Sequence, residues 1–132
     1  MKLFILTFII ATNLMSQEIN WIDNYQLALK NAQDSNKLVY ILITSDSCKW
    51  CKKFIRTTLK NEGINTRLNK NFITLHLIRD KNKIPDKFKT SPVPRHYFTN
   101  SKGDILYNAI GYRKVECFDS FMDNAEERYK QN

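Results

Sequence analysis

The sequence predicts an α/β fold in which a mixed β-sheet is flanked by helices. Two short apolar runs, residues 38–44 and 72–79, have the length and β-branched content of strands that are buried on both faces. An amphipathic segment precedes each run. Later in the chain, two more strands joined by a turn signal lead into a final helical segment. A βαβ unit followed by a ββα unit predicts a sheet with both parallel and antiparallel strands.

The first third of the chain predicts a helix and then a strand. Residues 20–37, "NWIDNYQLALKNAQDSNK", place apolar side chains three or four positions apart, which is the spacing of one helix face. The strand "LVYILIT" follows at residues 38–44. The apolar helix face consists of Trp21, Tyr25, Ala28 and Ala32.

The middle of the chain predicts a second helix and a second buried strand. The helix is expected over residues 51–71, with an interruption near Gly63. The strand "FITLHLIR" occupies residues 72–79, and we expect its His76 to be a hydrogen-bonded histidine of the core or the sheet edge. A polar loop with room for one helical turn, residues 80–94, comes next.

The last third predicts an antiparallel hairpin and a closing helix. The turn signal "NSKG" separates the strands "RHYFT", residues 95–99, and "DILYNAIG", residues 104–111. The chain of 132 residues suits one domain, and no linker or change in composition marks a second one. The closing helix, residues 115–129, has an apolar face formed by Val115, Phe118, Met122 and Ala125.

The first residues have the pattern of a secretory signal peptide. Lys2 is followed by an apolar run from Leu3 to Ala11, which is far shorter than the roughly 20 residues of a membrane-spanning helix. We therefore expect a signal peptide at residues 1–16, a single domain at residues 17–132 and export to the periplasm. An uncleaved membrane tether and a buried first helix are the alternatives.

The composition is that of an ordinary globular protein with a basic surface. Hydrophobic residues make up 42% of the chain and charged residues 26%, and the formal net charge is +8. The lysines are scattered and do not alternate with aromatic residues on one element, as a platform for single-stranded nucleic acid requires. We therefore expect no nucleic-acid partner and, from the size, a monomer.

The motif "CKWC" places Cys48 and Cys51 at a spacing that serves haem attachment, metal binding or redox chemistry. Covalent haem attachment needs a histidine directly after the second cysteine, and position 52 is a lysine. A structural zinc site needs four ligands, so two more would have to come from distant parts of the chain. The candidates are isolated from one another in the sequence: His76, His96 and Cys117.

Redox chemistry needs only what the motif contains. The pair lies where a buried strand ends and a helix begins, and the free backbone N–H groups of a helix N-terminus favour a thiolate. Lys49, Lys52 and Lys53 add positive charge nearby. Cys51 lies one turn along the same helix face, so it can close a disulfide with Cys48. We expect Cys48 to attack and Cys51 to resolve the mixed disulfide, with no bound cofactor.

With a second segment, "SPVPRHYF" at residues 91–98, the motif resembles the thioredoxin superfamily. The resemblance covers about residues 19–130, and it implies a cis proline at Val93–Pro94 and a following hairpin with Gly111 near its end. It also implies that Pro94 packs against the disulfide and that the backbone of Val93 binds an extended substrate segment. Within the superfamily, the chain looks most similar to small bacterial periplasmic thioredoxin-like proteins and to the C-terminal domain of thiol:disulfide interchange proteins.

The resemblance implies a thiol:disulfide oxidoreductase acting on exported cysteine-containing proteins, for example apocytochromes c. A membrane thiol reductase would supply the electrons. The low cysteine count and the small size favour a reductant over an isomerase or an oxidant. The alternative is a non-catalytic adaptor in which the cysteine pair is a structural disulfide or a metal clip.

The sequence departs from the thioredoxin pattern at two places. Thioredoxins carry a buried Asp six positions before the first cysteine, which relays the proton of the second, and here that position is Leu42. Another group must therefore supply the relay, or it is missing. Lys49 and Trp50 replace the Gly-Pro pair between the cysteines, so the reduction potential of thioredoxin does not carry over.

Three further side chains have more than one candidate role each. Trp50 is expected either to cover the disulfide and contact the substrate or to pack against the loop that holds Pro94. Cys117 is expected in the core because it precedes Phe121 by one helical turn, with a regulatory or intermolecular disulfide and a metal role as the alternatives. Arg95 either attracts acidic segments of partners or points into solvent.

Overall fold

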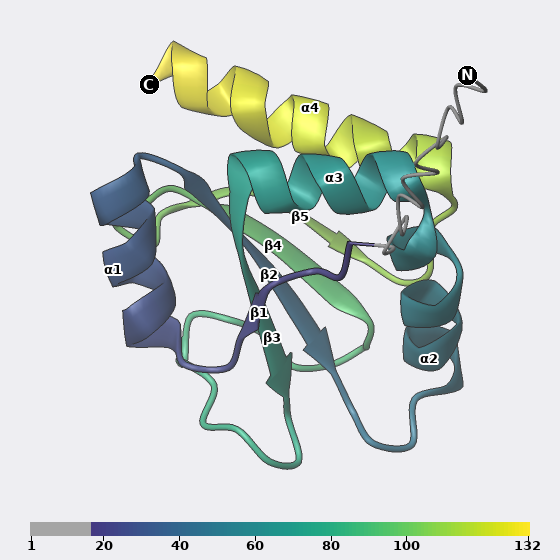
Figure 1. The fold of residues 1–132 in the computed structure, drawn as a ribbon. Coiled ribbons are helices and arrows are strands. Elements are labelled where there is room, and N and C mark those ends of the chain that lie inside the picture. Colours follow the sequence, from purple (N-terminus) through teal and green to yellow (C-terminus); the bar gives the residue numbers. More distant parts are fainter. Residues whose placement is uncertain (1–16) are drawn as a thin grey trace, which may run out of the picture.

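The structure, a computed structural model, describes residues 17–132, so the predicted signal peptide at residues 1–16 lies outside the described residues. Figure 1 shows these residues as one sheet flanked by helices. Within the described residues, no helix has both the length and the apolar character that a membrane span requires. The strands are β1 (Trp21–Ile22), β2 (Leu38–Thr44), β3 (Phe72–Ile78), β4 (Arg95–Thr99) and β5 (Ile105–Ile110). The helices are α1 (Tyr25–Ser35), α2 (Lys49–Arg56), the short 3₁₀ helix η1 (Thr58–Lys60), α3 (Glu62–Asn71) and α4 (Val115–Gln131).

The sheet is mixed, as the sequence predicts. Its strand order is β1-β3-β2-β4-β5. The first three strands of this order are parallel, β4 runs antiparallel to β2, and β5 runs antiparallel to β4. β2 is the middle strand, so the segment that follows it leaves the sheet at the strand ends, near the centre of the sheet.

Both faces of β2 are buried, which explains why the strand is a continuous apolar run. Leu38, Tyr40 and Leu42 face a core that they share with α2, α3 and α4. The alternating residues face a second core beneath α1. Figure 1 shows α1 on one side of the sheet and α3 and α4 on the other. The second core consists of Val39, Ile41 and Ile43 with Ala28, Ala32, Leu75, Leu77, Phe88 and Tyr97.

Helix α1 begins later than the apolar spacing predicts, and the prediction for Trp21 is wrong. Trp21 and Ile22 form a short edge strand that pairs in parallel with Thr74 and Leu75. The helix starts only after Asn24, whose side-chain oxygen accepts a hydrogen bond from the N–H of Leu27 at 2.9 Å. This cap fixes the boundary, because the N-cap residue has an extended backbone.

The second helical segment is interrupted earlier than predicted. The break lies at η1, between α2 and α3, and Gly63 is the second residue of α3. Asn61 caps α3 by accepting a hydrogen bond from the N–H of Ile64 at 3.1 Å. The cap, rather than the glycine, therefore sets the point at which a new helix begins.

Candidate active site

The cysteine pair lies at the junction between β2 and α2, as predicted. Cys48 is the N-cap residue of α2, and its Sγ accepts a hydrogen bond from the backbone N–H of Cys51 at 3.1 Å. The two residues form a disulfide with Cα atoms 5.2 Å apart. Cys51 is 1% exposed, whereas Cys48 is only partly buried. Of the two cysteines, only Cys48 therefore has appreciable exposed surface, and the N–H of Cys51 points at its sulfur.

The segment before β4 carries the predicted proline. The Val93–Pro94 peptide bond is cis, and so is the Ser91–Pro92 bond. Pro94 is buried, and its carbonyl oxygen accepts a hydrogen bond from the N–H of Gly111 at 2.8 Å. Val93 is half-buried, and within residues 17–132 no hydrogen bond engages its backbone N–H or C=O. Substrate binding by Val93 and packing of Pro94 on the disulfide remain predictions.

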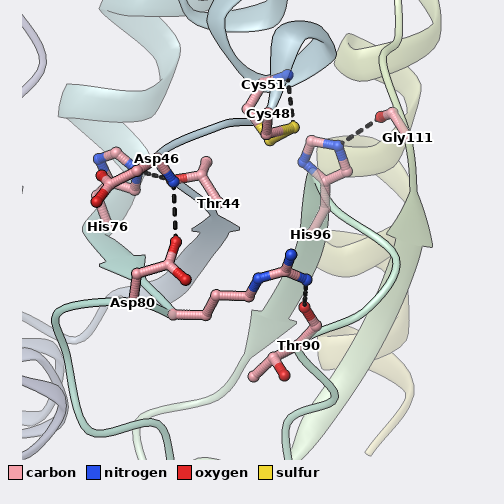
Figure 2. The surroundings of a disulfide bond; sticks show 10 residues. Thr44, Asp46, Cys48, Cys51, His76, Asp80, Thr90, His96 and Gly111 are labelled. Carbon is pink, nitrogen blue, oxygen red and sulfur yellow. Dashed lines mark hydrogen bonds between the residues drawn. A yellow bond between two sulfur atoms is a disulfide. The ribbon is translucent and has the colours of Figure 1, made fainter.

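A histidine lies opposite the position where thioredoxins have an acid. Leu42 is fully buried, and its partner across the antiparallel ladder is His96. Figure 2 shows His96 among the residues around the disulfide. Its Nε2 lies 2.8 Å from the carbonyl oxygen of Gly111, and its Nδ1 lies 2.8 Å from the hydroxyl of Tyr40. Because a carbonyl oxygen can only accept, Nε2 carries the proton and Nδ1 accepts from Tyr40.

This pair of buried side chains is uncharged at neutral pH. Burial lowers the pKa of His96 to about 4, and the positive charge of Arg113 acts in the same direction, against the hydrogen bond to Gly111. Burial also raises the pKa of Tyr40 well above its usual value. Hydrogen bonds occupy both ring nitrogens of His96, so its neutral imidazole is not available as a base for Cys51.

On the other side of the disulfide, the loops after β2 and β3 are tied together (Figure 2). The N–H of Asp46 donates to the carboxylate of Asp80 at 2.9 Å, and Lys81 pairs with Asp46 at 3.5 Å. Thr44 and His76 share a hydrogen bond of 2.8 Å between Oγ1 and Nε2. Burial lowers the pKa of His76. The prediction of a hydrogen-bonded histidine at this position is therefore confirmed.

Trp50 is exposed beside the disulfide and contacts a residue that sequence reasoning missed. It is 53% exposed, and its ring centroid lies 5.8 Å from that of Tyr112. The ammonium group of Lys53 lies 5.2 Å from the Trp50 centroid and 4.9 Å from the Tyr112 centroid. The sequence did contain a signal for Tyr112. In an antiparallel hairpin, the residue that follows the second strand lies beside the start of the first strand, so the predicted hairpin places Tyr112 near the segment that precedes β4. In the structure Ile110 pairs with Arg95, the first residue of β4.

The prediction that Cys117 lies in the core is wrong, since its side chain is exposed. Cys117 does lie one turn before Phe121 on α4. The buried face of α4, however, is centred one residue further along the helix. Successive side chains point about 100° apart around the helix axis, so this offset leaves Cys117 outside the buried face. The buried residues are Phe118, Phe121, Met122 and Ala125.

The prediction that Arg95 points into solvent is wrong. It is only 8% exposed, so it does not point into solvent. Its guanidinium donates to the hydroxyl of Tyr97 at 2.8 Å and to the carbonyl oxygen of Ser91 at 3.3 Å. These contacts connect the start of β4 to the proline-containing segment, and attraction of acidic partner segments by Arg95 stays a prediction.

Within residues 17–132, no group of three or more His, Cys, Asp or Glu side chains is arranged to hold a metal ion. Cys48 and Cys51 are paired with each other.

Comparison with known proteins assigns the chain to a family. Residues 10–99 match the family Thioredox_DsbH, described as "Protein of unknown function, DUF255". The chain belongs to this family. It is 32% identical over 97 residues to anterior gradient protein 3 of Mus musculus, which covers 71% of this chain and 57% of that protein. It is 29% identical over 69 residues to the uncharacterized protein B0495.5 of Caenorhabditis elegans, which covers 52% of this chain and 10% of that protein.

Two solved structures have the same fold as this member of the DsbH-type family. A structure titled "DsbH Oxidoreductase" superposes with a TM-score of 0.67 at 18% identity and covers 83% of this chain and 85% of that chain. A thioredoxin from Thermus thermophilus superposes with a TM-score of 0.66 at 19% identity and covers 86% and 87%. The thioredoxin fold that the sequence predicts is confirmed.

Proposed function

We propose that the chain is a thiol:disulfide oxidoreductase that acts through Cys48 and Cys51, as a reductant of exported cysteine-containing proteins in the periplasm. The observation that carries the proposal is the unequal exposure of a closed cysteine pair at a helix N-terminus. Cys48 is partly exposed and receives an N–H hydrogen bond, whereas its disulfide partner Cys51 is buried. The solved structure of similar fold whose title names an oxidoreductase adds support.

In the reduced protein, the thiolate of Cys48 attacks one sulfur of a substrate disulfide. That disulfide breaks, and its second sulfur leaves as a thiolate and takes up a proton. The thiolate of Cys51 then attacks Sγ of Cys48, which releases the first substrate sulfur as a second thiol. Two electrons pass from the dithiol to the substrate, and the protein ends as the disulfide seen in the structure. A membrane thiol reductase is the proposed source of electrons for the next cycle.

The N-terminal end of α2 favours the first step. The backbone N–H of Cys51, 3.1 Å from Sγ of Cys48, donates a hydrogen bond that is stronger when the sulfur carries a negative charge. Within the described residues, the half-buried Val93 has a backbone N–H and C=O without a hydrogen-bond partner, which suits β-type hydrogen bonds to an extended substrate segment.

A trapping experiment tests this proposal. In a Cys117→Ser background, the Cys51→Ser variant should accumulate a mixed disulfide between Cys48 and a peptide disulfide, visible by mass spectrometry and released by dithiothreitol. The matched control is Cys48→Ser in the same background, in which the remaining cysteine is buried and should trap nothing. If both variants trap equally, or neither does, the pair is structural and the adaptor alternative stands.

The reduction potential of the pair tests the direction of electron flow. Equilibration with glutathione buffers should give a value near about −270 mV, as in thioredoxin, if the protein is a reductant. A value between about −180 and −120 mV would assign an isomerase or an oxidant instead.

A further inference from the structure

A basic aromatic surface lies directly beside the disulfide. We call it the Trp50 surface, and it consists of Trp50, Lys53, Lys60, Tyr112 and Lys114. The ammonium group of Lys53 lies within 5.2 Å of both ring centroids, so the two rings and the charge form one unit. A large aromatic side chain that is 53% exposed next to a reactive sulfur is a candidate for contact with a partner.

A hollow continues this surface away from the sulfur atoms. It has a volume of about 470 Å³ and lies between η1 and the start of α4. Tyr112 lines it and also contacts Trp50, so the hollow and the exposed indole are continuous. Its other polar lining includes Lys60, Lys114 and Glu116.

The charge of the Trp50 surface is not neutralised within the described part of the chain. None of the ion pairs in residues 17–132 involves Lys53, Lys60 or Lys114. The sequence of α2, "KWCKKFIR", contains four basic residues and no acidic one. Glu116 is the one acidic side chain that lines the hollow in the described structure.

The phenol of Tyr112 lies among hydroxyl groups and positive charges. Its pKa is lowered by the nearby hydroxyl of Thr57 and by the charges of Lys53 and Lys114. Lysines that form no ion pair within residues 17–132, beside an exposed ring and a half-buried one, match an anionic segment that also offers apolar or backbone contacts.

We propose that the Trp50 surface binds an acidic polypeptide segment next to the target cysteine of the substrate, so that substrates with Glu or Asp close to their disulfide react fastest. The occupant is a polypeptide because the surface borders the sulfur that, under the proposed function, attacks protein disulfides. The inference rests on that function for its kinetic consequence, but binding to the surface can be measured without it.

The kinetic test uses matched peptides that each carry one cysteine as a mixed disulfide with thionitrobenzoate. Attack by the thiolate of Cys48 on the peptide sulfur releases thionitrobenzoate, which is followed by its absorbance. Attack by Cys51 then releases the peptide thiol. We compare peptides in which four flanking residues are Glu or Gln, using reduced protein with Cys117→Ser. At low salt the Glu peptide should react about tenfold faster, and the ratio should fall towards about two in 0.5 M salt.

Two double variants, each of which removes two positive charges, test whether the Glu-to-Gln rate ratio depends on the Trp50 surface. Lys60→Gln with Lys114→Gln should lower the Glu-to-Gln rate ratio at least threefold. Lys70→Gln with Lys130→Gln should leave the ratio unchanged, because these lysines lie near the C-terminal ends of α3 and α4, across the molecule from α2 (Figure 1). A wild-type ratio near one at low salt, or an equal fall in both double variants, overturns the proposal.

A binding measurement separates failure of this inference from failure of the proposed function. If no peptide reacts faster with the protein than with its Cys48→Ser variant, the proposed function is wrong. The Glu peptide with Ser in place of its cysteine should still shift the NMR signal of the Trp50 indole N–H, and the Gln peptide should shift it far less. Equal or absent shifts with both peptides refute the acidic-segment site on its own.

Discussion

The buried histidine beside the disulfide makes the stability of the fold depend on pH. His96 is fully buried, and its pKa is about 4 in the folded protein, against about 6.5 in an unfolded chain. Between these values the unfolded state binds a proton that the folded state does not, so protonation favours unfolding. The contribution is therefore fully present above about pH 6.5 and is lost as the pH falls towards 4.

The size of the effect follows from the two pKa values. A difference of about 2.5 units corresponds to a loss of about 3.4 kcal/mol once the pH is well below 4. Of this, about 2 kcal/mol is lost between pH 7 and pH 5, above the range in which most carboxylates titrate. The physical origin is the cost of placing a charged imidazole among Tyr40, Phe54 and Phe118, whose rings surround it.

Urea unfolding of the oxidised Cys117→Ser protein at several pH values measures the effect. The His96→Gln variant cannot titrate, so its stability should change by about 2 kcal/mol less between pH 7 and pH 5 than that of the parent. His76→Gln is the matched control. The pKa of His76 is also lowered by burial, but this side chain is only partly buried, so the change in slope should be smaller.

Parallel curves for the parent and His96→Gln would refute the reasoning, because they would mean that protonated His96 is tolerated in the folded state. If His96→Gln does not fold, NMR titration of the imidazole in the intact protein measures the same quantity. A value near 4 supports the argument, and a value near 6.5 refutes it.

Four further substitutions test the packing, the backbone and a set of ion pairs by chemical unfolding. Phe54→Ala should lower the free energy of unfolding by about 3–5 kcal/mol, because this ring is fully buried, and a loss below about 1 kcal/mol would contradict it. Gly103→Ala should be destabilising by about 1–3 kcal/mol, since φ is +86° and the added methyl would meet the Tyr25 hydroxyl. Gly111→Ala, at φ +93° without such a contact, should lose less. Arg67→Met removes ion pairs with two aspartates of α4 and should lose about 1 kcal/mol, less in 0.5 M salt.

The central strands were predictable because burial on both faces leaves a clear pattern in the sequence. β2 and β4 have the predicted bounds, and β3 is one residue shorter than predicted. β1 was missed because it has two residues, and its pairing with β3 joins segments about fifty positions apart. The hydrogen bond from the hydroxyl of Thr74 to the carbonyl oxygen of Asn20, at 2.8 Å, belongs to that pairing. No local periodicity signals such a contact.

The helix boundaries were predictable in principle, and they were misjudged for a physical reason. Apolar spacing continues through Trp21 and through η1, whereas a helix ends or begins where side chains can satisfy its free N–H groups. Asn24 and Asn61 provide those caps in the structure. Capping residues therefore set helix boundaries that hydrophobic spacing alone did not predict.

By itself, the sequence determined the fold class and the cysteine pair. Buried strands, amphipathic helices and a motif with three-residue spacing are local features, and the resemblance to thioredoxins rests on two short segments. The tertiary structure decided which cysteine is accessible, that His96 lies opposite Leu42, and that Tyr112 meets Trp50. These facts depend on strand order, register and burial, which arise from contacts between distant segments. A residue's neighbours across the sheet cannot be read from its neighbours along the chain.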